Sequence, residues 1–241
     1  PNGALVYCTL DEEVKNVCEH SRADVRKFPY GIPSHKIENG TTILLTNDKE
    51  YSLNIFGEHN LMNLNGARLV CNQIGLNDEQ FYAAIQSFGG AAKRLELVKK
   101  NDKTAVYKDF AHSPSKLKAT TQAVKKQYPN RQLVACMELH TFSSLNEEFL
   151  KQYNGAMALA DEAIVYFNPH TIAHKKLNAI TEQQVKDAFG GNNIKVYTDS
   201  ATLLGDLQAM NFDNKNLLMM SSGNFDGMDF AKIAALPSKE K

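Results

Sequence analysis

The chain has 241 residues, of which 43% are hydrophobic and 22% charged, a balance typical of a folded globular protein. Lys and Arg together number 27, and so do Asp and Glu, so the formal net charge is zero and no basic field is available to hold a nucleic-acid backbone. No apolar run approaches the roughly 20 residues that a membrane-spanning helix needs. We therefore expect neither a nucleic-acid partner nor a membrane span.

The start of the chain and its cysteines give two further expectations. Pro1-Asn2-Gly3-Ala4 contains neither an initiator Met nor the basic and apolar regions of a signal peptide, which predicts a segment of a longer protein. The four cysteines are widely spaced and none belongs to a C-x-x-C pair, so we expect free thiols in a reducing cytoplasm rather than disulfides or a zinc site. They are Cys8, Cys18, Cys71 and Cys136.

The first 90 or so residues mix strand-like and helix-like patterns. Two β-rich runs flank Asn47-Asp48-Lys49, which is typical of a hairpin. Apolar residues then recur at spacings of three and four until Gly75, and a second helical pattern ends at Gly89-Gly90. The expected elements are a strand over 5–7, a helix from 11, strands over 41–45 and 51–56, and helices over 59–74 and 78–88.

Strands and helices alternate regularly in the rest of the chain. Strands are expected over 94–98, 105–110, 132–137, 163–167, 194–197 and 217–220, and helices over 115–127, 146–152, 182–189 and 203–210. Repeated β-α-β units of this kind predict the α/β class, with a Rossmann-like, mostly parallel sheet covered by helices on both faces. Such sheets bind ligands at the carboxyl ends of their strands.

Two asparagines open the helix that follows Gly57. Asn60 and Asn63 are three residues apart and share a helix face. Asn60 could simply cap the helix. Asn63 is inside the helix, where its carboxamide offers a donor and an acceptor that suit the edge of a nucleobase.

An arginine and an aspartate–histidine turn are candidates for binding anions and sugar hydroxyls. Arg94 follows a glycine pair and is either an anion clamp or a solvated charge on a strand. Asp109 and His112 lie where a strand gives way to a helix with Ser115 as its expected N-cap, so Asp109 could accept from ribose hydroxyls and His112 could contact phosphate. The alternative is an Asx turn with an exposed histidine.

Two more polar loops are expected at carboxyl ends of strands. Residues 138–144 follow a strand that ends at Met137, and residues 221–227 follow one that ends at Met220. The second loop contains glycine and could bring backbone N–H groups close to an anion. Each could equally be an ordinary polar loop.

In this order, the segments resemble the Mur ligase family. That family carries a G-x-H-N-x-x-N helix, then a G-x-x-x-R-x-E strand, then an Asp-aromatic-(Ala/Gly)-His-x-Pro turn. The matching segments here are Gly57–Asn63, Gly90–Glu96 and Asp109–Pro114. The resemblance implies that residues 1–95 are the C-terminal part of a truncated mixed α/β ATP-binding domain and that residues 96–241 are the acceptor-binding domain.

The resemblance also implies roles for individual residues. Asn60 and Asn63 would contact adenine, and Asp109 would hold the ribose. Arg94 would reach the ATP phosphates, and His112 would lie near the reacting phosphates, which makes these two the catalytic candidates. The residues expected in the acceptor pocket are His140, Thr141, Ser143, Gly223 and Asn224.

The activity implied is an ATP-dependent amide ligation in peptidoglycan synthesis or recycling. The lactyl carboxylate of UDP-N-acetylmuramate becomes an acyl phosphate, which an amine then attacks. ATP and Mg²⁺ are the implied cofactors, with the metal ligands expected upstream of this chain. The oligomeric state is left open.

The acceptor has two candidates. Lys93–Glu96, Phe110 and Ser222–Gly227 look more like the ligase for the tripeptide L-alanyl-γ-D-glutamyl-meso-diaminopimelate, while the alternative acceptor is L-alanine. Ser113 replaces a second histidine that both sub-groups commonly carry, and Met137–His140 departs from both patterns. Further alternatives are a folylpolyglutamate-type ligase and a non-catalytic nucleotide- or peptide-binding module.

The chain alone is predicted not to catalyse ligation. Its sequence contains no G-x-x-x-x-G-K-[ST] loop, so it lacks that cradle for the β- and γ-phosphates of ATP. Phosphate release by residues 1–241, measured with ATP, Mg²⁺, UDP-N-acetylmuramate and each acceptor, is expected to stay at background. Turnover above background would contradict this prediction.

Overall fold

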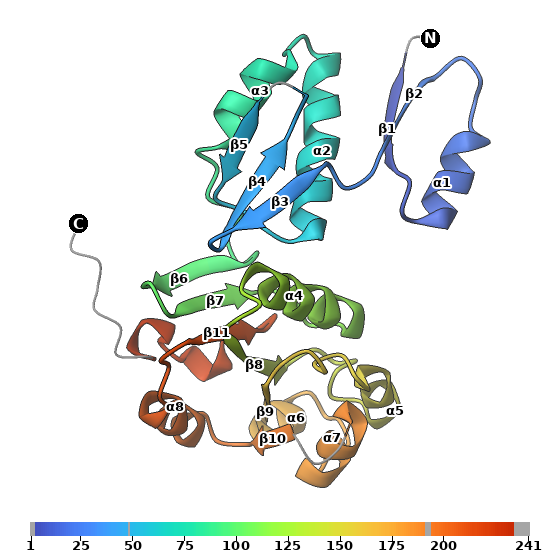
Figure 1. Cartoon of the computed structure of the whole chain (residues 1–241). Helices are drawn as coiled ribbons and strands as arrows, with labels where there is room; N and C mark the ends of the chain where they lie inside the picture. The colour runs from blue at the N-terminus through green and yellow to red at the C-terminus, as the bar shows by residue number, and fades with distance from the viewer. Residues whose placement is uncertain (1–2, 48, 191–193, 234–241) are drawn as a thin grey trace. The chain divides into compact units, whose positions relative to one another are not determined.

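The computed structural model describes residues 3–47, 49–190 and 194–233. The chain divides into two compact units, Pro1–Gly90 and Ala91–Lys241 (Figure 1). The domain boundary expected after residue 95 lies five residues beyond this division and stays a prediction.

The first unit combines a parallel strand pair with an antiparallel sheet. β1 (Ala4–Cys8) pairs with β2 (Arg26–Tyr30), and α1 (Glu12–Glu19) connects them. β3 (His35–Glu38), β4 (Thr41–Leu45) and β5 (Glu50–Leu53) form the antiparallel sheet, followed by α2 (Glu58–Gln73) and α3 (Asp78–Ile85). Leu44, Leu53, Leu61, Leu64 and Phe81 form its buried core. The hairpin and all three helices expected here are confirmed.

β2 and β3 were not expected from the sequence. The segment Arg26-Lys27-Phe28-Pro29-Tyr30 carries two cations and a proline, which lower its strand signal. It forms a strand because β1 supplies a parallel partner, with Val6 opposite Phe28 and Cys8 opposite Tyr30. Such pairing depends on a distant segment and leaves little local pattern.

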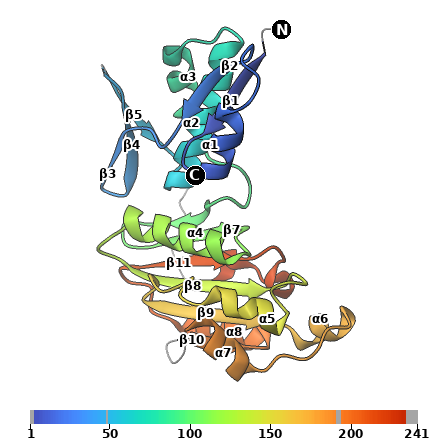
Figure 2. The ribbon, with the colours of Figure 1, turned by 90° about the vertical axis from the view of Figure 1, so that its right-hand side faces the viewer.

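The second unit contains a six-stranded sheet in the order β10-β9-β8-β11-β7-β6. Its strands are β6 (Glu96–Lys100), β7 (Ala105–Asp109), β8 (Gln132–Leu139), β9 (Glu162–Phe167), β10 (Ile194–Tyr197) and β11 (Lys215–Met220). All neighbours are parallel except β6, which is antiparallel to β7. The Rossmann-like, mostly parallel sheet is therefore confirmed. Figure 2 shows β11, β8, β9 and β10 lying side by side in this order.

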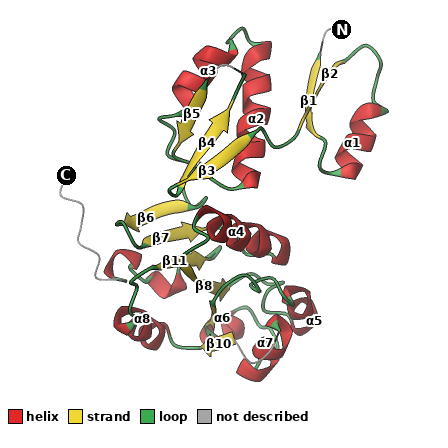
Figure 3. Ribbon diagram, in the orientation of Figure 1, coloured by secondary structure: helices red, strands yellow, loops and turns green. Residues whose placement is uncertain are grey.

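Helices cover both faces of this sheet (Figure 3). The helical segments are α4 (Pro114–Gln127), α5 (Glu147–Leu150), the 3₁₀ turn η1 (Lys151–Tyr153), α6 (Pro169–His174), α7 (Glu182–Phe189), α8 (Ser200–Ala209), and the 3₁₀ turns η2 (Phe225–Gly227) and η3 (Phe230–Lys232). Leu203 and Leu207 of α8 pack on alternate strand residues such as Val134 and Ile164. α4 contacts β8 and β11, and in the figure it lies on the opposite face from α8. Both faces of the central strands are thus buried, as a parallel sheet requires.

Several boundaries differ from the sequence expectation, and three of these adjoin candidate site residues. α4 begins at Pro114 with Ser113 at its N-cap, so the expected cap at Ser115 is wrong; proline is well suited to the first helical position. β8 continues to Leu139, which places Glu138 within the strand. β6 starts at Glu96, so Arg94 lies in the turn before the strand.

Gly66→Ala is predicted to destabilise the first unit. Gly66 is buried in α2, and an added Cβ would lie 2.9 Å from the Tyr30 ring of β2. Overpacking costs about 1–3 kcal/mol, which exceeds the roughly 0.5–1 kcal/mol that alanine contributes to a helix interior. Gly205→Ala in α8 is the control because nothing lies within 4 Å of its added Cβ. Thermal unfolding should show a loss for the first variant and a gain for the second; equal effects would contradict the argument.

Candidate functional site

The turn after β7 is built around a buried carboxylate. Asp109 is the last residue of β7 and only 6% exposed. Its Oδ1 accepts from the Ala111 amide and its Oδ2 from the Leu95 amide, each at 2.7 Å. The Asx turn is therefore formed, and the same carboxylate holds Leu95, whose φ is 45°. The contact of Asp109 with ribose stays a prediction.

Arg94 and His112 lie against one aromatic ring. The Arg94 guanidinium carbon is 5.5 Å from the centre of the Phe110 ring, and His112 meets the same ring edge-on with 5.2 Å between centroids. His112 Nδ1 lies 2.8 Å from the Phe110 carbonyl oxygen, which can only accept, so Nδ1 carries the proton and Nε2 remains for a ligand. The structure thus brings together the two side chains expected to contact phosphate.

The two asparagines of the expected adenine site belong to the first unit. The N-cap of α2 is Gly57, with a φ of 89°, so Asn60 is not the capping residue. Its Nδ2 instead donates to the Phe56 carbonyl at 2.9 Å and ties the preceding turn to the helix. Asn63 is exposed on the same helix. Their contact with adenine stays a prediction.

Glu138 is a buried carboxylate at the carboxyl end of β8, and only 3% of its side chain is exposed. Its Oε2 accepts from the Phe225 amide at 2.9 Å and from the Ser221 hydroxyl. Ser221 Oγ accepts from the Gly223 amide at 2.6 Å, so the hydroxyl proton points to Glu138. Because Ser221 N donates to the Asp109 carbonyl at 3.0 Å, the network links β7, β11 and β8. No role of this kind was expected for Glu138.

Gly223 lies where the loop after β11 crosses the end of β8. A Cβ at this position would be 2.8 Å from Glu138 Oε2 and 2.8 Å from His140 Cγ. The His140 Nδ1 atom is 3.5 Å from Glu138 Oε1. His140 and Gly223, both expected in the acceptor pocket, are thus in direct proximity, and close approach explains the glycine.

A second carboxylate anchors the same loop. Asp226 Oδ2 accepts from Asn168 Nδ2 at 2.5 Å and from the Tyr166 hydroxyl. Phe225 and Asp226 have φ values of 51° and 55°, a conformation costly for residues with a Cβ. Burial, followed by the hydrogen bond to Asp226, raises the pKa of Tyr166, so the phenol stays a donor. Asn224, in contrast, is exposed.

The loop after β8 also contacts α6. Lys175 Nζ lies 4.2 Å from the centre of the Phe142 ring, which is 61% exposed. Thr141 Oγ1 lies 3.1 Å from Ser143 Oγ and accepts from the Ser144 amide at 3.0 Å, so these hydroxyls mainly serve a local turn. We call residues 140–144, 168–175 and 221–227 the three-loop edge, because side-chain contacts join all three.

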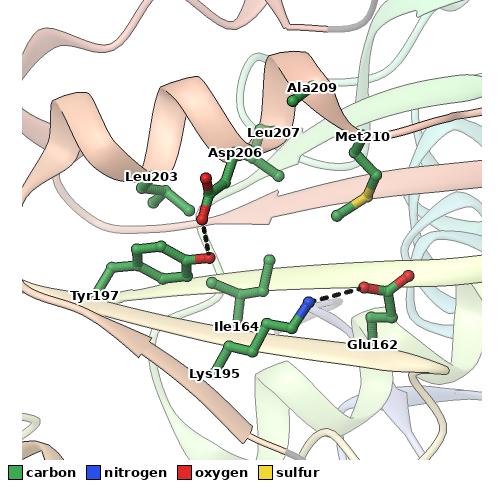
Figure 4. Close-up of a pocket in the computed structure, with 9 residues that line it drawn as sticks. All are labelled: Glu162, Ile164, Lys195, Tyr197, Leu203, Asp206, Leu207, Ala209 and Met210. Carbon is green, nitrogen blue, oxygen red and sulfur yellow. Dashed lines mark hydrogen bonds and ion pairs between the residues drawn. The ribbon is translucent and has the colours of Figure 1, made fainter.

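This site shows no metal-binding cluster among the described residues, and a groove on the same sheet lies apart from it. Among the described residues, no three His, Cys, Asp or Glu side chains are grouped to hold a metal ion. A groove of about 320 Å³ lies between α8 and the strands β9 and β10 (Figure 4). Its polar groups pair with one another, Tyr197 with Asp206 at 2.6 Å and Lys195 with Glu162 at 3.4 Å. Glu162 begins β9, so the groove extends to the edge opposite the three-loop edge.

The second unit is an α/β domain with helices on both faces of its sheet. Its polar and charged side chains gather at the carboxyl ends of β7, β8 and β11, where domains of this class bind ligands. Its sequence matches the family described as "Mur ligase, glutamate ligase domain" over residues 93–223, more than half of the chain. The protein therefore belongs to the Mur ligase family. No helix in the described part of the chain is long and apolar enough to cross a membrane.

Curated relatives carry the name of one ligase. The chain is 28% identical over 221 residues to the UDP-N-acetylmuramate–L-alanine ligase of Cytophaga hutchinsonii, covering 88% of this chain and 47% of the relative. It is 30% identical over 162 residues to the enzyme of the same name from a Sulfurihydrogenibium species, covering 63% and 36%. The chain thus spans about half, or less, of the length of these relatives.

Solved structures share the fold. MurC of Thermotoga maritima, a UDP-N-acetylmuramate–alanine ligase, matches with a TM-score of 0.62 and 17% identity over 83% of this chain and 45% of that one. A murein peptide ligase of Psychrobacter arcticus matches with 0.57 and 17% over 98% and 52%. MurF of Acinetobacter baumannii matches with 0.70 and 15% over 96% and 52%.

Gly223→Ala is predicted to destabilise the three-loop edge. The added methyl group would press on Glu138 and His140, and overpacking of this kind costs about 1–3 kcal/mol. Gly89→Ala is the control, since Gly89 is an exposed loop glycine with nothing within 4 Å and its substitution should change stability by less than about 0.5 kcal/mol. Denaturant unfolding measures both. If the Gly223 variant is as stable as its control, the loop can shift to accommodate the methyl group and the prediction is wrong.

Proposed function

We propose that this chain is the C-terminal part of an ATP-dependent ligase that forms an amide on the lactyl carboxylate of UDP-N-acetylmuramate. Family membership and the names of the curated relatives support this proposal. ATP phosphorylates the carboxylate, and an amine attacks the acyl phosphate. The observation that carries the proposal is the cluster of Arg94 and His112 around Phe110, next to the loop that follows β11.

The acceptor proposed first is L-alanine, because curated relatives from several bacteria carry the name of the L-alanine ligase. This choice departs from the tripeptide expected from the motifs. The tripeptide stays a second candidate on one structural observation: His170, His174 and Lys175 of α6 and its C-cap extend the three-loop edge with groups that can carry positive charge. Such groups suit an acceptor with several carboxylates.

Roles follow from the chemistry of each group. Arg94 offers a planar fork of donors, and His112 Nε2 becomes a second N–H donor when the imidazole is protonated, so both are proposed to contact the ATP phosphates in the transition state. Asp109 has both oxygens engaged by backbone amides and holds the Arg94 turn in place; its remaining lone pairs are proposed to meet the ribose. Bound ATP and Mg²⁺ would supply the phosphoryl group and neutralise its charge.

Residues 1–95 are proposed to be the end of the ATP-binding domain. Asn63, exposed on α2, is then available to contact adenine, with Asn60 supporting the start of the helix. The phosphate loop, the metal ligands and the UDP-binding part would be supplied by sequence outside this chain. The four cysteines are free thiols in the structure and are compatible with a proposed cytoplasmic site of action.

The full-length protein is predicted to ligate L-alanine to UDP-N-acetylmuramate. The assay measures phosphate release and the mass of the nucleotide product, with L-alanine and the tripeptide supplied separately. A higher kcat/KM with L-alanine than with the tripeptide supports the first acceptor, and a higher kcat/KM with the tripeptide supports the second. Ligation of neither acceptor would overturn the proposed function.

A further inference from the structure

Glu138 and His140 form a pair at the carboxyl end of β8. His140 Nδ1 is 3.5 Å from Glu138 Oε1, and the two side chains are 39% and 3% exposed. One nitrogen of the imidazole therefore faces a buried carboxylate. Nε2 is left as the ring nitrogen available to a ligand at the three-loop edge.

Neighbouring groups hold the Glu138 carboxylate and the His140 ring in their relative orientation. Oε2 of Glu138 is engaged by the Ser221 hydroxyl and the Phe225 amide, which leaves Oε1 for His140. Gly223 packs against the imidazole, where even a methyl group would come within 2.8 Å of Cγ. The ring is thus confined between the carboxylate and the loop after β11.

Two titratable neighbours of Glu138 stay neutral. Burial raises the pKa of the Cys136 thiol on β8, and burial followed by the Asp226 hydrogen bond raises that of the Tyr166 phenol on β9. Asp226 itself is bound by Tyr166 and Asn168. The Glu138 carboxylate, 3.5 Å from His140 Nδ1, is therefore placed to balance a proton on His140.

The proposed reaction needs such a group. The α-amino group of a peptide has a pKa of about 8, and that of a free amino acid is higher, so at neutral pH most of either acceptor is a protonated ammonium. An ammonium has no lone pair and cannot attack a carbonyl carbon. A base beside the acceptor must take one proton before the C–N bond forms.

We infer that His140 is the base that deprotonates the acceptor amine and that Glu138 is its positioning residue. The inference rests on the proposed ligase function. The ammonium transfers one proton to His140 Nε2, and the freed lone pair forms the C–N bond at the acyl carbon. The C–O bond to phosphate breaks, and phosphate leaves with that electron pair and takes the second nitrogen proton.

The test uses the full-length ligase and two nucleophiles. Hydroxylamine is a weakly basic amine that is already neutral at neutral pH, so it traps the acyl phosphate as a hydroxamate without a base. His140→Gln is expected to lower kcat for the natural acceptor by about 100-fold, the lower end of general-base effects, while hydroxamate formation is unchanged. His20→Gln, at the exposed end of α1, is the control and should change neither rate.

The pH profile separates a base from a carboxylate-binding cation. With His140 as base, kcat/KM of the wild type rises as the imidazole loses its proton, and this rise moves to higher pH in His140→Gln. Glu138→Gln is expected to lower kcat about 10-fold, equal to about 1.4 kcal/mol, with hydroxamate formation retained. Glu182→Gln, on the exposed start of α7, is its control.

Each other outcome overturns the inference. Loss of both amide and hydroxamate by His140→Gln would assign His140 to folding or to acyl phosphate formation. A raised KM for the acceptor with unchanged kcat would make it a binding residue. A wild-type enzyme that forms neither product would refute the proposed ligase itself, which the other two results do not.

Discussion

Two carboxylates buried at the ends of parallel strands determine the form of the candidate site. Asp109 ends β7 and Glu138 lies next to the end of β8, and β11 lies between them. A buried carboxylate is tolerated only when donors surround it. Here the donors are mostly backbone amides of the connecting segments, those of Leu95, Ala111 and Phe225. The hydrogen bonds that stabilise the two buried carboxylates therefore also hold the connecting segments in one conformation.

This arrangement places strain where the loop after β11 turns. Phe225 and Asp226 both occupy the left-handed region, at a cost of the order of 1–3 kcal/mol each. Phe225 offsets its cost by full burial against Tyr166 and by donating to Glu138. Asp226 is held by Tyr166 and Asn168. The loop thus keeps one shape through contacts with three strands, which is the preorganisation that a binding site needs.

The sequence predicted the regular parts of this architecture because their patterns are local. α7 carries a capping box at Thr181 and a glycine stop at Gly190, and it spans the residues expected. The motifs also located Asp109, Arg94 and His112 near one another, since all lie at the ends of β6 and β7. The role of Glu138 could not be predicted, because its partners Ser221 and Phe225 are more than 80 residues away. One signal was present: a single carboxylate within the apolar run Leu133–Leu139.

The order of the strands separates two groups of candidate site residues. The cluster of Arg94, Phe110 and His112 lies near the end of β7, and β8 carries Glu138 and leads into His140. Because β11 separates the two strands, their ends lie two strand spacings apart, roughly 10 Å. Under the proposed function, the phosphoryl group of the acyl phosphate would face the first cluster and the incoming amine would face the second. Phosphate-contacting and amine-contacting groups on one strand would compete for the same space. The insertion of β11 between β7 and β8 therefore keeps the groups proposed to contact phosphate apart from the proposed base His140, which must stay free of phosphate to accept a proton.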